Sequence, residues 1–177
     1  VKFLQDQKIK NIVVVGGTNS LEAGDFLVDN NIKIALEQPH NLPSMEDEDI
    51  KSRFRLASQL INKGVTVAVD ATGQMTRMNT RNLPFFAGSF AAYGVEKEKA
   101  VETITLNAAK VLGIEDNYGS IEVGKSATLF ISHGDALDMR TNNLSHAYID
   151  GREVSLETNQ TKLWQRYKKK VEEEKKQ

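Results

Sequence analysis

Residues 12–17 read IVVVGG, a short and continuous apolar run that ends at two glycines. Such a run is typical of a strand buried on both faces, as in a parallel sheet. Residues 32–36 (IKIAL) and 65–69 (VTVAV) predict two further strands. Helical spacing of apolar side chains predicts helices over residues 21–30 and 49–63, one in each gap between strands. This order favours an α/β fold in which helical crossovers join parallel strands.

After the third strand, the chain predicts helices and then a different kind of sheet. Helices are expected over residues 84–92, from residue 96 onward, and over residues 108–112 with Asn107 as the cap. From residue 116 short strand candidates alternate with glycines, which favours an antiparallel sheet. The candidates are residues 118–123, 127–131, 144–149 and 153–156, followed by a helix from about residue 160. The predicted segments are therefore residues 1–114, 115–158 and 159–177.

The composition is that of an ordinary soluble globular protein, and it excludes several classes of site. Of the 177 residues, 40% are apolar and 27% are charged, and the formal net charge is −1. This charge provides no global field that would recruit nucleic acid or an acidic membrane, and no apolar run reaches the ~20 residues that cross a bilayer. The chain holds no cysteine, which removes disulfides, Cys-ligated zinc and a cysteine nucleophile.

The beginning of the chain bears on its completeness and its location. The first residue is Val1, and residues 1–7 already predict a helix. Because a natural chain starts with methionine, we expect a missing N-terminal portion, which would have carried any targeting segment. The sequence leaves a cytoplasmic and a periplasmic location equally open.

Residues 119–126 read GSIEVGKS and match the phosphate-binding pattern G-x-x-x-x-G-K-[ST] in full. In that reading Lys125 would contact the terminal phosphates of a nucleotide. The chemistry requires a buried strand before the loop and a helix after it. Here no buried strand precedes the match, and the stretch after it (residues 127–131, ATLFI) predicts a strand. A hairpin turn explains the glycines, so nucleotide binding is the least favoured hypothesis.

Several stretches, in order along the chain, carry a resemblance to a known family. They are residues 82–88 (NLPFFAG), 91–95 (AAYGV), 100–113 (AVETITLNAAKVLG), 119–129 (GSIEVGKSATL) and 147–154 (AYIDGREV). Together they resemble imidazolonepropionase-like proteins of the amidohydrolase superfamily. Two positions depart from the usual pattern, because Ala108 replaces a proline and Thr128 replaces an aspartate.

The resemblance implies a fold and a function. Residues 1–114 would be the last strand–helix units of a (β/α)8 TIM-type barrel. Residues 115–158 would belong to a small antiparallel composite β-domain, and residues 159–177 would be a C-terminal helix. The implied activity is metal-dependent hydrolysis of C–N bonds in cyclic amides or related small molecules. The implied cofactor is a divalent metal, zinc above all, which activates a water.

The metal ligands that the resemblance implies are mostly missing from this chain. The H-x-H pair of the first barrel strand has no counterpart, and VGG (residues 15–17) stands where a later histidine is expected. Asp70 directly follows the third strand, where the last ligand is expected. It is the candidate catalytic and metal-binding residue, although an ungapped count places the family aspartate nearer Thr72-Gly73. An acid that caps the turn after the strand is the alternative.

Other side chains are candidate site residues because they follow predicted strands. His40 follows the second strand, and we treat it as a second candidate metal ligand; an exposed histidine in a proline-rich loop is the alternative. The loop after the third strand offers polar groups for a substrate, because loops on that face of a barrel carry function. Those candidates are Arg77, Asn79, Arg81 and Asn82.

Three hypotheses follow. The first is that the chain is the C-terminal part of a metal-dependent amidohydrolase and is inactive by itself. The second is a non-catalytic amidohydrolase-like protein, and the third is nucleotide binding through Lys125. Three strands of an eight-stranded barrel would leave unpaired edges. We therefore expect either a missing N-terminal portion or a homo-oligomer to cover them.

Overall fold

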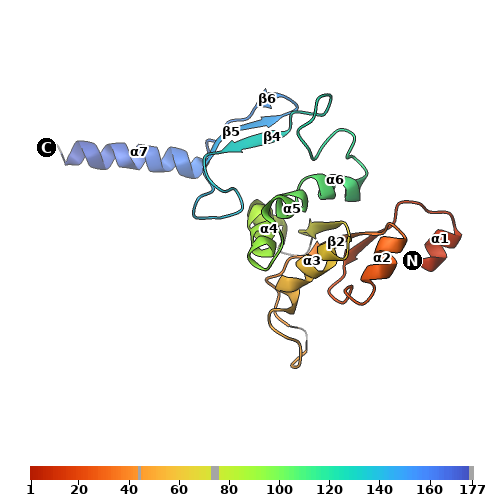
Figure 1. Cartoon of the computed structure of the whole chain (residues 1–177). Coiled ribbons are helices and arrows are strands. Elements are labelled where there is room, and N and C mark those ends of the chain that lie inside the picture. Colours follow the sequence, from red (N-terminus) through yellow and green to blue (C-terminus); the bar gives the residue numbers. More distant parts are fainter. Residues whose placement is uncertain (44, 73–75, 176–177) are drawn as a thin grey trace.

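The computed structural model describes residues 1–43, 45–72 and 76–175, and at Thr76 and Arg77 the backbone alone. A parallel sheet with its helices forms the larger part of the molecule (Figure 1). A separate antiparallel sheet lies beside it, and the last helix extends away from both. The chain therefore has the α/β organisation that the sequence predicts, with two sheets of different kinds.

The parallel sheet consists of β1 (Val13–Gly16), β2 (Lys33–Glu37) and β3 (Val67–Asp70), in that order. Both strand pairs are parallel. A short helix, α1 (Lys2–Asp6), precedes the sheet, and α2 (Gly24–Asp29) and α3 (Ser52–Asn62) connect the strands. The predicted β-α-β-α-β order is confirmed. The helix α2 begins later than predicted because residues 17–24 form successive turns, in which Ala23 N donates to Ser20 O and Gly24 N to Leu21 O.

The hydrophobic core lies on one face of this sheet. Ile34, Leu36 and Val67 are almost completely buried and pack with side chains of α3 and α4. Burying an aliphatic or aromatic side chain of this size contributes roughly 1.5–3 kcal/mol. The opposite face is open by comparison, since Val15 in β1 keeps 63% of its surface exposed. The helices thus cover a single face of the three strands.

The outer edge of β3 is bound by the segment between two helices, α5 (Lys97–Glu102) and α6 (Leu106–Leu112). Val69 N donates to Thr103 O at 3.0 Å, and Asn107 Nδ2 donates to Val67 O at 3.1 Å. The helix predicted from residue 96 is confirmed as α5 but does not extend past Glu102, because the chain leaves the helix to supply these two groups to the strand. Asn107 does not cap α6 either, since the N-cap is Thr105.

A 3-10 helix, η1 (Thr76–Asn82), leads from β3 into α4 (Leu83–Ala92), which covers the sheet. The loop formed by residues 134–142 packs onto α4. Leu137 in this loop is buried, and its backbone carbonyl lies so close to Gly88 that a Cβ there would overlap it. Lys97 Nζ donates to Asp135 Oδ2 at 2.6 Å. These contacts join the antiparallel part to the helices of the parallel part.

The antiparallel sheet consists of β4 (Leu129–Ser132), β5 (Leu144–Ile149) and β6 (Arg152–Glu153). The predicted strand over residues 118–123 is wrong. That segment forms turns, in which Lys125 N donates to Glu122 O and Ser126 N to Asn117 O. The last predicted strand, residues 153–156, shrinks to the two residues of β6. Short hairpin strands without buried apolar partners give little energy to extend the pairing.

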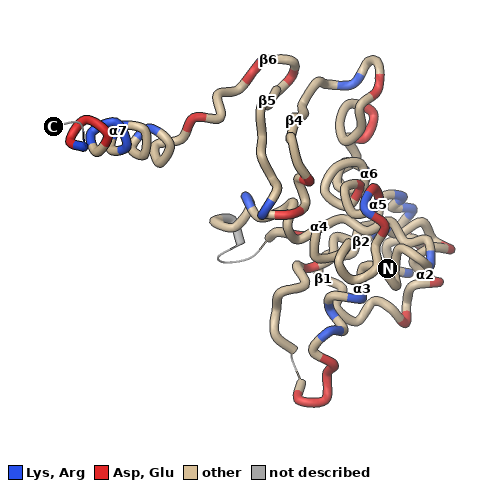
Figure 2. Tube along the Cα trace, turned by 60° about the vertical axis from the view of Figure 1, so that its left-hand side comes forward, with Lys and Arg blue, Asp and Glu red and all other residues tan. Residues whose placement is uncertain are grey.

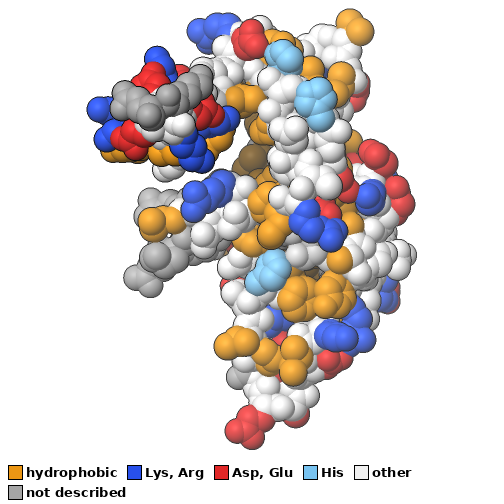
Figure 3. Space-filling view, turned by 90° about the vertical axis from the view of Figure 1, so that its left-hand side faces the viewer, with side chains coloured by type: hydrophobic (Ala, Val, Ile, Leu, Met, Phe, Trp, Pro, Cys, Tyr) orange, Lys and Arg blue, Asp and Glu red, His pale blue; other side chains and the backbone are white. Residues whose placement is uncertain are grey.

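The final helix, α7 (Asn159–Glu174), confirms the helix predicted from about residue 160. It contains no buried residue and extends away from the two sheets (Figure 1), so that Figure 3 shows it end-on. Its C-terminal half holds a block of lysines (residues 168–170) and then a block of glutamates (residues 172–174; Figure 2), which form three i,i+4 pairs at 4.0 Å. Among the helices of the described residues, none is long and apolar enough to cross a bilayer.

Candidate active site at the strand ends

Two carboxylates lie side by side where the parallel strands end. Glu37 and Asp70 are partners in the parallel register of β2 and β3. Successive side chains of a strand point to opposite faces, and the buried Ile34 and Leu36 point toward the helices. Glu37 and Asp70 therefore lie on the other face, at the carboxyl edge of the sheet. This edge is where open parallel sheets bind ligands.

Asp70 uses one of its oxygens to hold the turn that follows β3. Its Oδ1 accepts a hydrogen bond from Thr72 N at 2.7 Å. This is the capping arrangement expected of an acid between a strand and a loop. The second oxygen, Oδ2, has no hydrogen bond among the residues that the structure describes. Asp70 can therefore cap the turn and still present one oxygen to a ligand.

Glu37 is accompanied by an arginine that the sequence did not single out. Only 11% of the Arg53 side chain is exposed, and its Nη1 lies 3.9 Å from Glu37 Oε2. Its Nε donates to Glu48 Oε1 at 3.1 Å, and Ser52 Oγ donates to the same oxygen at 3.1 Å. The guanidinium thus lies between two carboxylates and offsets part of the negative charge at the end of β2.

His40 packs against the helices on the covered face of the sheet. Its ring makes an edge contact with Phe54 at 5.5 Å and a tilted contact with Phe86 at 5.6 Å. The Ser89 hydroxyl lies 3.1 Å from His40 Nε2. Burial against these groups lowers the pKa of His40 below its ordinary value. Among the described residues, His40 therefore contacts Phe54, Phe86 and Ser89, and it forms no hydrogen bond or ion pair with Asp70.

The candidate substrate-binding residues all follow β3 in η1. Asn79 and Arg81 are exposed, and Asn82 is half-buried at the start of α4 without a side-chain cap bond. The side chain of Arg77 lies outside the described residues. The described members of this group are placed near the carboxyl edge by the chain itself, since η1 begins six residues after Asp70.

The donor set of the described residues does not make a complete metal site. Within that part of the chain, no three histidine or carboxylate side chains are grouped so that they could hold a metal ion. A zinc site needs at least three protein ligands. Asp70 fits the role of one ligand, and Glu37 is already next to Arg53. Any metal at this edge would need most of its ligands from elsewhere.

The P-loop match folds as a turn. Lys125 Nζ donates to Ser120 Oγ at 2.6 Å and lies 3.3 Å from Glu122 Oε1, while Ser126 donates to Asp150. The strand β4 follows it, where a phosphate-binding loop requires a helix. The lysine, the serine and the glycines thus hold a turn of the antiparallel part.

Glu37 and Arg53 are the residues at this edge that sequence reasoning missed. A signal for Glu37 was present, because Lys33, Ala35 and Glu37 alternate with Ile34 and Leu36. Such alternation indicates a strand with one covered and one open face. No comparable signal marks Arg53, which reaches the strand end from α3.

Comparison with known proteins agrees with the resemblance. Residues 21–154 match the sequence model of the Amidohydrolase family. The imidazolonepropionase of Syntrophobacter fumaroxidans (strain DSM 10017 / MPOB) is 30% identical over 86 residues, which cover 48% of this chain and 20% of the relative. The imidazolonepropionase of Shewanella baltica (strain OS185) is 67% identical over 30 residues, 17% of this chain and 7% of the relative.

Solved structures match over most of this chain. An amidohydrolase from Thermotoga maritima MSB8 superposes with a TM-score of 0.72 and 26% identity, covering 87% of this chain and 39% of that protein. An adenosine deaminase from Xanthomonas campestris with bound zinc superposes with a TM-score of 0.64 and 20% identity, covering 94% and 44%. The chain thus spans less than half the length of these proteins.

Proposed function

Because this chain belongs to the amidohydrolase family, we propose that it is the C-terminal part of a metal-dependent hydrolase acting on C–N bonds of cyclic amides or related small molecules. The observation that carries the proposal is the family match over residues 21–154, combined with Glu37 and Asp70 at the carboxyl edge of the matched strands. The similarity to imidazolonepropionases favours imidazolone propionate and other cyclic amides as the first substrates to test.

The proposed barrel follows from the open features of the sheet. The edge of β1 would pair with a strand of the remaining barrel units. The exposed side chain of Val15 would face the interior that these units close. We propose that an N-terminal portion of the same protein supplies them, since the chain covers only 39% of the matched Thermotoga structure. Supply by a second copy in a homo-oligomer is the alternative. In both cases residues 1–177 by themselves would be inactive.

The metal, with zinc as the first candidate, would supply the activated water when it is bound. The described residues contribute one ligand at most, so the remaining ligands would come from the other part of the protein. What this chain supplies is a carboxylate fixed by the turn at Thr72 and polar groups of η1 for the substrate. A non-catalytic role is the second candidate. Arg53 already forms an ion pair with Glu37, and the described residues do not form a complete set of metal ligands.

The test is hydrolysis of imidazolone propionate and a panel of cyclic amides by the full-length protein. Asp70→Asn keeps an oxygen that can accept the Thr72 hydrogen bond and removes the charge. We expect kcat/KM to fall about 100-fold or more, the scale on which loss of a catalytic carboxylate acts. The matched control is Asp29→Asn, an exposed acid of α2, which should leave kcat/KM unchanged. Absence of turnover by the wild-type full-length protein would favour the non-catalytic role.

A further inference from the structure

The carboxylate of Glu37 at the end of β2 is an acceptor that the described residues leave open. Among them, this carboxylate takes part in no hydrogen bond, and its ion pair with Arg53 spans 3.9 Å. A hydrogen bond from a guanidinium requires about 2.7–3.2 Å, so Arg53 offsets negative charge without taking up an oxygen. The Glu37 side chain keeps 41% of its surface exposed. Its oxygens can therefore accept from a ligand.

Backbone pairing places this acceptor beside Asp70. Glu37 and Asp70 are partners in the parallel register of β2 and β3, and neighbouring strands lie about 4.8 Å apart. Partners in such a register point to the same face of the sheet. Asp70 Oδ2 also has no hydrogen bond among the described residues. A small ring can therefore contact both side chains at once.

The counter-charge of Glu37 is held independently of Glu37 itself. Arg53 Nε donates to Glu48 Oε1 at 3.1 Å, and only 11% of the Arg53 side chain is exposed. The same Glu48 oxygen accepts a hydrogen bond from Ser52 Oγ at 3.1 Å. Arg53 therefore keeps its place when a ligand binds to Glu37.

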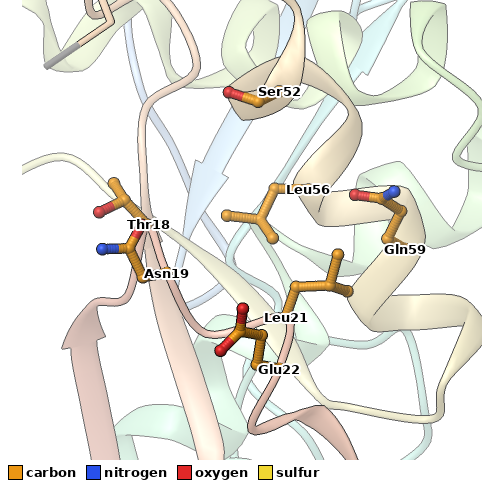
Figure 4. Close-up of a pocket in the computed structure, with 7 residues that line it drawn as sticks. All are labelled: Thr18, Asn19, Leu21, Glu22, Ser52, Leu56 and Gln59. Atoms are coloured by element: carbon orange, nitrogen blue, oxygen red, sulfur yellow. The ribbon is translucent and has the colours of Figure 1, made fainter. Parts of the chain in front are cut away.

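Open volume adjoins these residues. Ser52 belongs to the lining of a cavity of about 400 Å³ between the loop after β1 and α3. Figure 4 shows Ser52 at one end of this cavity and the apolar side chains of Leu21 and Leu56 within it. The cavity is linked to the strand end through Glu48, which accepts from both Ser52 and Arg53. The site is thus not closed by packed side chains in this direction.

From this arrangement we infer that Glu37 determines specificity by accepting a hydrogen bond from the ring N–H of a cyclic amide. A carboxylate offers acceptors and no donor. The ring oxygen of a lactone would bring lone pairs to the same place and leave the carboxylate unpaired, and a site built for an N–H rejects the analogue that lacks it. The inference rests on the proposed function, because it takes the strand ends as the substrate site.

NMR titration of the full-length protein with 2-pyrrolidinone and γ-butyrolactone tests the inference, since these five-membered rings differ only in N–H against O. We expect the lactam to bind about tenfold more tightly, the scale of one hydrogen bond to a charged group. Glu37→Gln should reduce this preference to about twofold, because the glutamine amide can both accept from N–H and donate to a ring oxygen. Glu153→Gln, a change at an exposed acid of β6, should keep the tenfold preference.

The inference is overturned by no saturable binding of 2-pyrrolidinone, by equal affinities for lactam and lactone, or by a preference that Glu37→Gln leaves unchanged. Its outcome is separable from that of the proposed hydrolysis. A preference that depends on Glu37 in a protein without turnover would support the role of Glu37 and count against hydrolysis. Turnover of cyclic amides with a preference independent of Glu37 would do the reverse.

Discussion

Arg53 shows how one side chain can decide the electrostatics of a strand end. Its side chain is only 11% exposed, and its guanidinium lies between Glu37 and Glu48. Removing it would leave two carboxylates without their common counter-charge in a partly buried place, and such losses are costly because desolvated groups remain unpaired. Sequence reasoning found Asp70 from its place after a strand. It could not find Arg53, since the contact depends on how α3 packs over β2.

The Arg53→Gln variant is therefore expected to lower the free energy of unfolding of the full-length protein by about 1–3 kcal/mol. Urea denaturation measures this change. Arg166→Gln is the matched control, because Arg166 is exposed on α7, and a change within about 0.5 kcal/mol is expected there. Equal midpoints for the two variants would show that the Arg53 contacts with Glu37 and Glu48 carry no stability.

His40 leads to a prediction about pH. Its burial lowers the pKa below the ordinary 6.5, so the folded protein binds this proton less readily than the unfolded chain. The corresponding stability is fully present above 6.5 and is lost as the pH falls through that value toward the folded pKa. We expect the unfolding free energy to fall more steeply with acidification in the wild type than in His40→Gln. Parallel pH profiles would contradict the partial burial of the His40 ring against Phe54 and Phe86.

Among the elements, the helices and parallel strands were predictable, and the positions of the breaks between them were not. The runs IVVVGG, IKIAL and VTVAV produce β1, β2 and β3 because each can be buried by the helices that follow it. The break between α5 and α6 has a tertiary cause, since Thr103 and Asn107 bond to β3. The stretch 118–123 carries β-forming residues but folds as turns, because nothing in the described structure covers Ile121 or Val123.

Gly88 provides the test at this scale. In an exposed helix, glycine to alanine stabilises by roughly 0.5–1 kcal/mol. Here the new methyl group would overlap the carbonyl of Leu137, so the loop formed by residues 134–142 would have to move off α4. We expect Gly88→Ala to destabilise the full-length protein by about 1–3 kcal/mol in urea denaturation. The sign of the change in unfolding free energy is the test, because a stabilised Gly88→Ala variant would mean that the loop formed by residues 134–142 does not pack on α4.

At the scale of the whole molecule, the described residues form a sheet with one covered face and one open face. Within the part of the chain that the structure describes, β1 is an edge strand of the parallel sheet and α7 contains no buried residue. The family could be read from ordered matches in the second half of the chain, and the family model covers residues 21–154. The structure places Asp70 at the carboxyl edge of the sheet, where the sequence predicts it, and the described residues gather no group of three potential metal ligands around it. His40, the second predicted ligand, is instead held by Phe54, Phe86 and Ser89.

The central claim is that Asp70 gives one ligand to a metal centre completed by the rest of the protein. Metal analysis of the purified full-length protein, wild type against Asp70→Asn and Asp29→Asn, tests it most directly. The account predicts stoichiometric divalent metal in the wild type and in Asp29→Asn, and loss of that metal in Asp70→Asn while the fold is kept. A metal-free wild-type protein, or undiminished metal in Asp70→Asn, would contradict it.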